Sequence, residues 1–244
     1  MAISSFLRIA LIRIVSWFYV SGKSKAIFYH DIHSDKRYTD MSTPIELFKN
    51  HIKIIRESGF EIVKEITNTY GQIEICFDDA FLGLYDNIEL IKEQNIPVHL
   101  FVISSFLNKT NHINKEQLMT LNRLNEISIS SHTKTHKILN GLPVDELKKE
   151  LSLSKIELEN ILNKEVDGVC FPKGKYSDKV IKIAKECGYK RLYSSLPGFY
   201  FNEISSGLIN RSLVQFSGKY EFKAILKGGD HVLALWYKFK HFKK

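Results

Sequence analysis

Cysteine and proline are scarce in this chain of 244 residues, which contains three cysteines and five prolines. The cysteines stand alone at Cys76, Cys170 and Cys187, so there is no CxxC pair and their number is odd. This pattern argues against a disulfide framework and against a zinc site built from thiolates. We therefore expect free thiols in a reducing compartment.

Sequence patterns for nucleic-acid and dinucleotide binding are also missing. The net charge is +8, but the lysines are spread along the chain, with a cluster only at its end. No zinc-finger, RNA-binding or helix-turn-helix pattern accompanies this charge, so we expect no nucleic-acid partner. No glycine-rich phosphate loop follows the first predicted strand, which disfavours a dinucleotide-binding fold.

The chain lacks a long uncharged hydrophobic run. Residues 2–20 are strongly apolar, but Arg8 and Arg13 interrupt them. A membrane-spanning helix usually needs about 20 residues with few charges, and no small-residue cleavage site is evident. Because Trp17 and Phe18 accompany the two arginines, a helix lying in a membrane interface is one interpretation. A terminal helix packed on the domain is a second, and a signal or anchor segment is a third.

Apolar strands alternate with amphipathic helices through most of the remaining sequence. Strands are predicted at residues 25–30, 60–63, 73–77, 98–103, 127–131, 166–171 and 191–194. Helices are predicted at residues 84–94, 115–124, 143–162 and 177–187, and another between Thr43, its expected N-cap, and Gly59. Such alternation predicts an α/β fold with a parallel sheet and helices outside it. About seven strands with polar ends favour a barrel over an open sheet.

The sequence predicts three segments. Residues 1–22 are expected to form an apolar N-terminal helix and residues 23–227 the barrel. Residues 228–244 are expected to form a basic aromatic tail that is helical from residue 231. The irregular stretch 196–227 contains three glycines and is expected to close the barrel with strands or loops.

Two adjacent carboxylates, Asp78 and Asp79, directly follow the predicted strand 73–77. Buried carboxylates are costly unless they are paired, hydrogen-bonded or bound to a metal. The pair therefore indicates a nearby cation, or one acid with a raised pKa. The alternative is an aspartate pair that begins a loop and caps the next helix.

Two histidines, His132 and His136, follow the strand 127–131 and stand four residues apart. At this spacing both rings can face one point, and in a barrel the carboxyl ends of the strands open on the same face. One carboxylate and two imidazoles form a metal-ligand set with room for water or substrate. The second carboxylate is then free to act as a general base. The alternative is a structural aspartate pair beside two hydrogen-bonded histidines.

A third polar strand end is the stretch from Cys170 to Tyr176. Pro172 and Gly174 predict a tight turn here. A backbone N–H in such a turn can stabilise an oxyanion. The alternative is an ordinary turn between a strand and a helix.

Taken as a set, these strand ends resemble the motifs of the polysaccharide deacetylase family, which is carbohydrate esterase family four with the nodulation-type chitooligosaccharide deacetylase domain. The resemblance spans roughly residues 25–211, and the stretch Phe28-Tyr-His-Asp31 is similar to the first strand of many members. The matching motifs are Phe77-Asp78-Asp79, His132-x-x-x-His136 and Phe171-Pro-x-Gly174.

This resemblance implies a distorted (β/α) barrel, usually of seven strands. It also implies metal-dependent removal of acetyl groups from sugars, often from an N-acetylated hexosamine in a polysaccharide or its lipid-linked precursor. Asp78 would be the base, and Lys173 would supply an oxyanion-binding N–H. The implied ligands of Zn²⁺, with Co²⁺ or Ni²⁺ as alternatives, are Asp79, His132 and His136. The implied lining of the acetyl pocket is Phe171, Pro172, Lys173 and Gly174.

The chain departs from the family pattern at two places. Many members begin the third motif with an arginine that orients the base, whereas Cys170 or Phe171 stands here. Arg211 resembles an arginine found after the barrel strands in some members, and we expect it to take that role. Many members also carry a late Leu-x-His that supplies the general acid, whereas this chain has Gln215 in that region. His30, at a strand end, is the preferred substitute, ahead of His99 and His231.

Two other functions stay open at this point. One is a catalytically degenerate barrel that binds glycan, and the other is an O-acetyl esterase or another hydrolase that uses the same metal site. The free thiols and the missing cleavage site predict a cytoplasmic protein. The arginine-bearing N-terminus and the basic tail predict peripheral contact with the inner face of the membrane.

Overall fold

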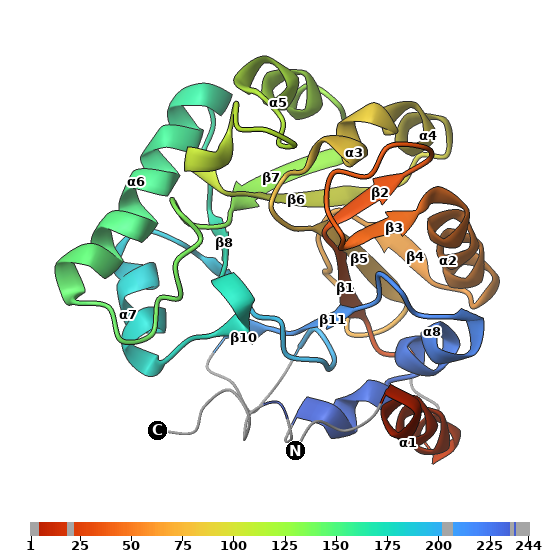
Figure 1. The fold of residues 1–244 in the computed structure, drawn as a ribbon. Coiled ribbons are helices and arrows are strands. Elements are labelled where there is room, and N and C mark those ends of the chain that lie inside the picture. Colours follow the sequence, from red (N-terminus) through yellow and green to blue (C-terminus); the bar gives the residue numbers. More distant parts are fainter. Residues whose placement is uncertain (1–4, 19–21, 202–206, 235–236, 238–244) are drawn as a thin grey trace.

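The computed structural model describes residues 5–18, 22–201, 207–234 and 237. Its centre is a ring of parallel strands, and the helices lie outside this ring (Figure 1). The strands that form the main sheet are β1 (Lys25–Tyr29), β4 (Glu61–Val63), β5 (Gln72–Phe77), β6 (Val98–Val102), β7 (Ile127–Ser131), β8 (Gly168–Cys170), β9 (Arg191–Tyr193), β10 (Leu208–Ile209) and β11 (Arg211–Leu213).

One short segment closes the ring. The strands pair in the order β1-β5-β6-β7-β8-β9-β10, and β11 pairs with β1. Leu208 of β10 lies opposite Leu192 of β9, and Arg211 of β11 lies opposite Ala26 of β1. Only Asn210 separates β10 from β11. Residues 208–213 therefore act as a single strand, the seventh of the ring, which connects β9 at one edge of the sheet to β1 at the other. The predicted parallel barrel of about seven strands is confirmed, but the predicted strand 60–63 is not part of the ring: it is β4, which among the described strands pairs only with β5.

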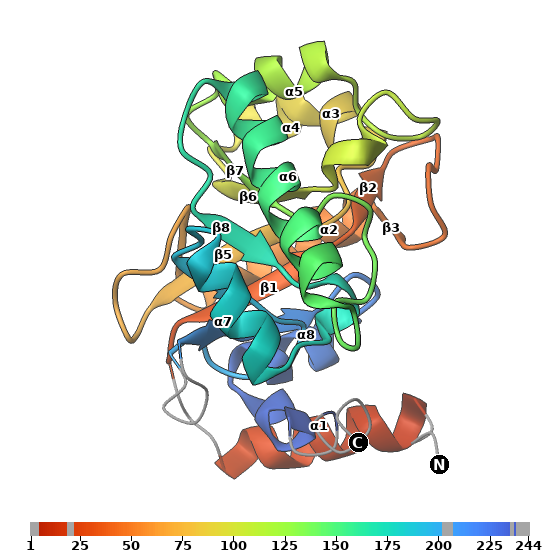
Figure 2. The same cartoon turned by 90° about the vertical axis from the view of Figure 1, so that its left-hand side faces the viewer.

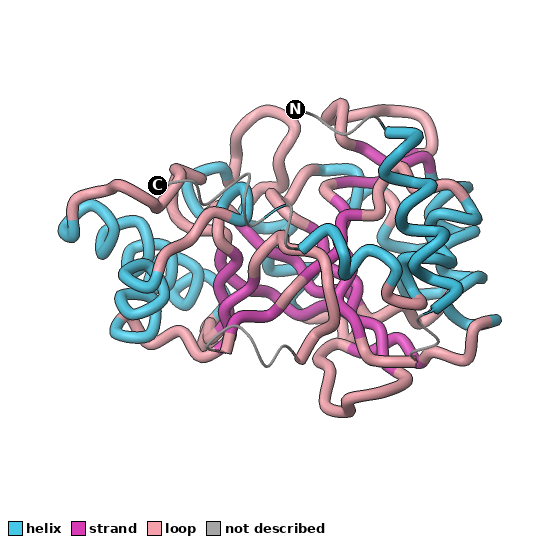
Figure 3. Tube along the Cα trace, turned by 90° about the horizontal axis from the view of Figure 1, so that it is seen from below, coloured by secondary structure: helices cyan, strands magenta, loops and turns pink. Residues whose placement is uncertain are grey.

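The strand sequences are apolar on both faces because both faces are buried. All six residues of β5 are buried, as expected for a parallel strand covered by helices. Ile75 and Phe77 belong to the core between the strands and the helices, whereas Cys76 packs inside the barrel with Phe28 and Tyr193. Side chains therefore fill the ring, and Figure 3 shows the strands enclosed between helices on both sides.

Among the described residues, the helices between residues 45 and 186 follow the predicted alternation. The helix at residues 219–226 does not, because only strands or loops are expected in the stretch 196–227. The predicted helix 84–94 is divided at Asn87, whose side-chain amide donates a hydrogen bond to the Gly83 carbonyl at 2.8 Å. Such a local side-chain bond competes with the helical ladder. The helices are α2 (Ile45–Glu57), α3 (Leu82–Asp86), α4 (Ile88–Glu93), α5 (Lys115–Asn122), α6 (Val144–Leu162), α7 (Asp178–Glu186) and α8 (Lys219–Leu226).

The predicted N-cap of α2 is wrong. Pro44, and not Thr43, occupies the cap position. Thr43 lies in a short strand, β3 (Ser42–Pro44), which pairs with β2 (Asp31–His33). Its hydroxyl donates a hydrogen bond to the Gln215 carbonyl at 2.9 Å. Pairing between distant segments thus overrides the local capping preference, and it anchors the chain near Gln215.

Helix α1 (Ser5–Phe18) packs on α8 and on the short turn η3 (Gly229–His231). Figure 2 shows it lying across one end of the molecule, below α8. Ile12 and Ser16 are buried at this contact, and Arg8 forms an ion pair of 2.7 Å with Glu221. Among the described helices, none is long and apolar enough to cross a membrane. The helix predicted from residue 231 onward lies largely outside the described residues.

The start of α3 packs tightly against β2, and this contact fixes the loop that follows Asp79. A Cβ atom on Gly83 would overlap the Ile32 carbonyl oxygen and the Asp31 carboxylate. We expect Gly83→Ala to lower the free energy of unfolding by about 1–3 kcal/mol, the usual cost of overpacking. Chemical denaturation measures this change. Gly22→Ala is the control, because no atom of the described residues lies within 4 Å of a Cβ there. Equal effects of the two substitutions would contradict the expectation.

Candidate functional site

A cavity of about 600 Å³ opens at the carboxyl ends of the barrel strands. Asp78 and Asp79 enter it after β5, and His132 enters it after β7. His30 follows β1, and His136 lies four residues after His132 in the loop that precedes α6. The structure thus brings together polar residues from separate parts of the chain, because parallel strands all end on one face of the barrel.

The Asp79 carboxylate faces two imidazole rings. Its Oδ1 lies 3.5 Å from His132 Nε2 and 3.6 Å from His136 Nε2. This oxygen is buried and has no hydrogen-bond partner within the described part of the chain. Because such an oxygen is costly to bury, its position between two ring nitrogens fits a bound divalent cation. One carboxylate and two imidazoles suit zinc, and they also suit cobalt or nickel.

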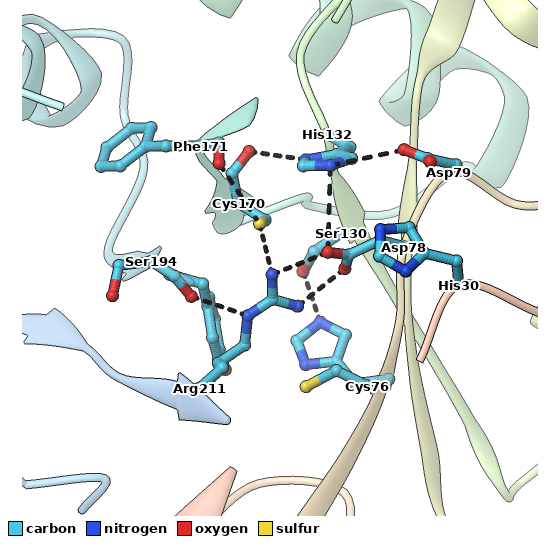
Figure 4. A network of polar contacts seen from close by, with 12 residues as sticks. His30, Cys76, Asp78, Asp79, Ser130, His132, Cys170, Phe171, Ser194 and Arg211 are labelled. Carbon is cyan, nitrogen blue, oxygen red and sulfur yellow. Dashed lines mark hydrogen bonds and ion pairs between the residues drawn. The ribbon is translucent and has the colours of Figure 1, made fainter. Parts of the chain in front are cut away.

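The two histidines present ring nitrogens to Asp79. Nδ1 of His132 donates to the Cys170 carbonyl at 2.8 Å, which leaves Nε2 facing Asp79 (Figure 4). A second bond of this kind commonly fixes the tautomer of a metal-binding histidine. Burial and the neighbouring His132 ring lower the pKa of His136 to about 4. The His136 ring is therefore neutral at neutral pH.

Three residues at the cavity have left-handed backbone conformations that are unusual for residues other than glycine. The φ angles are 71° at Asp79, 62° at His136 and 56° at Lys173. Each such conformation costs on the order of 1 kcal/mol and persists only where the surroundings impose it. All three residues line the cavity, so the strain coincides with the place where the side chains converge.

Asp78 has a different partner from Asp79. The Arg211 guanidinium donates to both Asp78 oxygens, at 2.7 and 2.8 Å, and its Nε donates to the Ser194 carbonyl at 3.0 Å (Figure 4). Arg211 is fully buried and Asp78 is only 3% exposed. Burial alone would raise the pKa of Asp78, but Arg211 and, to a smaller extent, His132 hold it well below its usual range. Asp78 is therefore an ionised carboxylate with a fixed orientation.

The thiols beside Arg211 are not nucleophiles. Cys170 and Cys76 are buried, and burial raises the pKa of both thiols well above the usual value. Because the thiolate is the reactive form, these residues cannot carry out nucleophilic catalysis at neutral pH. Arg211 Nη2 lies 2.8 Å from the Cys170 sulfur, so Cys170 completes the surroundings of the guanidinium.

Comparison with known proteins identifies this arrangement. The sequence pattern named polysaccharide deacetylase matches residues 66–192, just over half of the chain. The chain belongs to the polysaccharide deacetylase family. YxkH of Bacillus subtilis (strain 168), named as a polysaccharide deacetylase, is 26% identical over 188 residues. That match covers 72% of this chain and 66% of YxkH, slightly less than two thirds of the relative.

Solved structures share the fold of this deacetylase family member. The deacetylase PplD of Streptococcus pyogenes, solved in complex with acetate, is 19% identical with a TM-score of 0.72, over 82% of this chain and 96% of PplD. IcaB of Ammonifex degensii is 16% identical with a TM-score of 0.73, over 85% of this chain and 98% of IcaB. At these identities the likeness shows the fold, and the site must be argued from the residues of this chain.

The family's third motif is divided between the cavity and the core. Lys173 and Gly174 line the cavity in the turn η2 (Pro172–Gly174). Phe171 is fully buried in the outer core, and Pro172 is buried behind the turn. Neither residue lines the cavity, so the predicted substrate contact through their side chains is not supported. Phe171 and Pro172 instead lie behind Lys173 and Gly174, which form the cavity wall.

His30 contacts Gln215, which stands in the region where many family members carry a late histidine. His30 Nδ1 lies 2.7 Å from Gln215 Oε1, and both residues line the cavity. Because the amide oxygen is an acceptor, Nδ1 carries the hydrogen. The sequence analysis singles out His30 and Gln215 individually, but no sequence pattern predicts that they are in contact.

A buried polar network inside the barrel was not predicted. Glu74 accepts hydrogen bonds from His99 Nδ1 at 2.6 Å and from the Tyr193 hydroxyl at 3.0 Å, and His99 Nε2 lies 2.8 Å from the Ser130 hydroxyl. His99 is fully buried, so it cannot be the acid that reaches a substrate. The network joins strands β5, β6, β7 and β9, and such contacts do not follow from sequence spacing.

Proposed function

We propose that this chain is a metal-dependent deacetylase that removes the acetyl group of an N-acetylated hexosamine. The observation that carries the proposal is that two adjacent carboxylates have different partners. Asp78 is paired with a buried arginine, whereas Asp79 faces two imidazoles and has a buried oxygen without a hydrogen-bond partner among the described residues. One carboxylate is thus available as a base, and the other as a metal ligand.

The residues that would hold the ion are Asp79, His132 and His136. When bound, a divalent metal there would polarise the acetyl carbonyl and make an attacking water more acidic. The ligand set leaves positions open for substrate, as catalytic zinc sites do.

Asp78 would take a proton from the attacking water. His132 Nε2 lies 4.0 Å from Asp78 Oδ2, so the base stands directly beside the ligand set. Arg211 is a positioning residue, because it holds Asp78 ionised and oriented but does not itself line the cavity. A positioned general base contributes typically about 10²- to 10⁴-fold to the rate.

Two other parts of the cavity would stabilise the oxyanion and protonate the leaving amine. The left-handed backbone at Lys173 supports the assignment of its N–H as the donor to the developing oxyanion. His30 keeps the Nδ1 hydrogen in its bond to Gln215, so in its doubly protonated form it would give the Nε2 proton to the departing nitrogen. An amine is a poor leaving group without a proton, so the reaction needs such an acid.

The test is acetate release from a panel of N-acetylated and O-acetylated hexosamine oligosaccharides, with protein loaded with zinc, cobalt or nickel. We expect release from N-acetylated members. Release from O-acetylated members alone would replace the proposal by an esterase. Tight binding of the sugars without any acetate release would identify a degenerate glycan-binding barrel. The observation that favours this alternative is Gln215, which stands where many family members carry a histidine.

The role of His30 leads to a differential prediction. His30→Gln should lower kcat for an N-acetylated sugar about 10²-fold or more, yet it should change the hydrolysis of nitrophenyl acetate little, because a nitrophenolate leaves without a proton. His33→Gln is the control, since His33 bonds to Ser42 and does not line the cavity. Equal losses on both substrates would remove His30 from the acid role.

A further inference from the structure

Helix α1 exposes one apolar face, which we call the outer stripe. Four of its residues, at positions 7, 11, 14 and 18, recur at intervals of three or four, the spacing of one side of an α-helix, and Trp17 adjoins the last of them. They are between 37% and 84% exposed, which is unusual for so many large apolar side chains in one short helix. The members of the outer stripe are Leu7, Leu11, Ile14, Trp17 and Phe18.

A small basic hollow lies beside the outer stripe, between α1 and α8. Its volume is about 170 Å³, and it is lined by Arg13, Lys223 and Lys227 together with Trp17 and Tyr220. None of the described residues that line it is acidic. The Arg13 guanidinium lies 5.3 Å from the centroid of the Tyr220 ring, and Tyr220 is 68% exposed. The hollow therefore offers cations and aromatic surface to an anionic group.

An anionic lipid bilayer fits both features better than a second copy of this chain. A short amphipathic helix with Trp and Phe on one face and cations beside them is typical of helices that lie in a membrane interface. In a symmetric dimer the same surface meets itself, which would bring the basic hollows of two copies close together. Phosphate-bearing headgroups would instead neutralise Arg13 and Lys223.

The same helix forms part of the wall of the catalytic cavity. Arg8 and Ile12, on the packed side of α1, line the cavity that also contains Asp78. Leu213 and Phe216 line it as well and are 45% and 56% exposed, so part of the cavity rim is apolar. A bilayer in contact with the outer stripe would lie beside this wall.

We propose that α1 docks the protein on an anionic lipid bilayer through the outer stripe and the basic hollow, beside the cavity that receives the substrate. The substrate would then be an acetylated saccharide carried by a membrane lipid, and this second statement rests on the proposed deacetylase function. The docking itself does not depend on that function.

Co-sedimentation of the full chain with lipid vesicles tests the docking. We expect binding to phosphatidylcholine vesicles that contain phosphatidylglycerol, and much weaker binding to phosphatidylcholine alone. Arg13→Gln/Lys223→Gln should lower the partition coefficient roughly 30-fold, since each basic residue near an anionic surface contributes about fivefold. Leu11→Gln/Ile14→Gln should lower it roughly tenfold or more.

Matched control variants come from distant helices. Met119→Gln/Ile156→Gln replaces two exposed apolar residues on α5 and α6, and Lys115→Gln/Lys149→Gln removes two exposed charges from the same helices. Helix α5 lies at the end of the molecule opposite α1 in Figures 1 and 2. Both controls should bind vesicles as the wild type does.

The outcomes separate docking from catalysis. Absent binding of the wild type to anionic vesicles, or equal binding by the stripe variant, would overturn the docking. Self-association of the wild type that the stripe variant loses would assign the outer stripe to a second copy instead.

Leu11→Gln/Ile14→Gln should keep wild-type acetate release from a soluble oligosaccharide but lose release from an N-acetylhexosamine glycolipid in the vesicles. Equal rates of the wild type and this variant on the glycolipid would overturn the membrane-borne substrate while leaving the proposed function intact.

Discussion

Asp78→Asn should lower kcat/KM for an N-acetylated oligosaccharide by about 10²- to 10⁴-fold, the contribution of a positioned general base. The amide keeps the shape of the carboxylate, and its oxygen can still accept one hydrogen bond from Arg211. It cannot take a proton from water. The metal content should not change, because the three predicted ligands are intact. Steady-state acetate release and elemental analysis of the same samples measure both quantities.

Asp40→Asn is the control for this substitution, because the Asp40 side chain is fully exposed and lies outside the cavity. It should leave kcat/KM unchanged. A rate for Asp78→Asn within a few-fold of the wild type would contradict the base assignment. A parallel loss of rate and metal would show instead that Asp78 binds the ion.

Arg211→Met should lower the free energy of unfolding by about 3–5 kcal/mol, because it leaves the buried Asp78 carboxylate without its partner. The guanidinium is fully buried and makes four hydrogen bonds, to Asp78, to the Ser194 carbonyl and to the Cys170 sulfur. Methionine fills a similar volume, so most of the loss comes from the unpaired charge and not from a cavity. Chemical denaturation followed by circular dichroism measures it.

The double variant Arg211→Met/Asp78→Asn separates charge from packing. With no carboxylate left to ionise, this protein should be more stable than Arg211→Met alone, although it should be as inactive as Asp78→Asn. If removing the carboxylate gave no recovery of stability, the ion pair would not be the reason for the loss.

Sequence patterns were sufficient for the barrel because its strands are local features. Each strand is a short apolar run, and the polar residues that follow β5 and β7 mark the face where the strands end. Residues 208–213 were harder to interpret, since β10 and β11 have only two and three residues. Their strand structure comes from pairing with β9 and β1, and not from any local preference.

The site was only partly predictable for a similar reason. Asp79, His132 and His136 follow from their motifs, and the structure places their ligand atoms within 4.8 Å of one another. Phe171 was misplaced although strand alternation gives the answer: Cys170 packs inside the barrel, so the next residue must point outward. The contact between His30 and Gln215 joins residues 185 apart in the chain, and no local pattern encodes it.

The central claim is that Asp79, His132 and His136 bind one divalent metal ion. The most direct test is elemental analysis of the wild type and of His132→Gln/His136→Gln, purified in parallel and loaded with zinc, cobalt or nickel before dialysis. We predict about one ion per chain in the wild type and almost none in the double variant, as expected when two of three protein ligands of such a site are removed. No retained ion in the wild type under any loading condition, or equal metal in both proteins, would contradict the account.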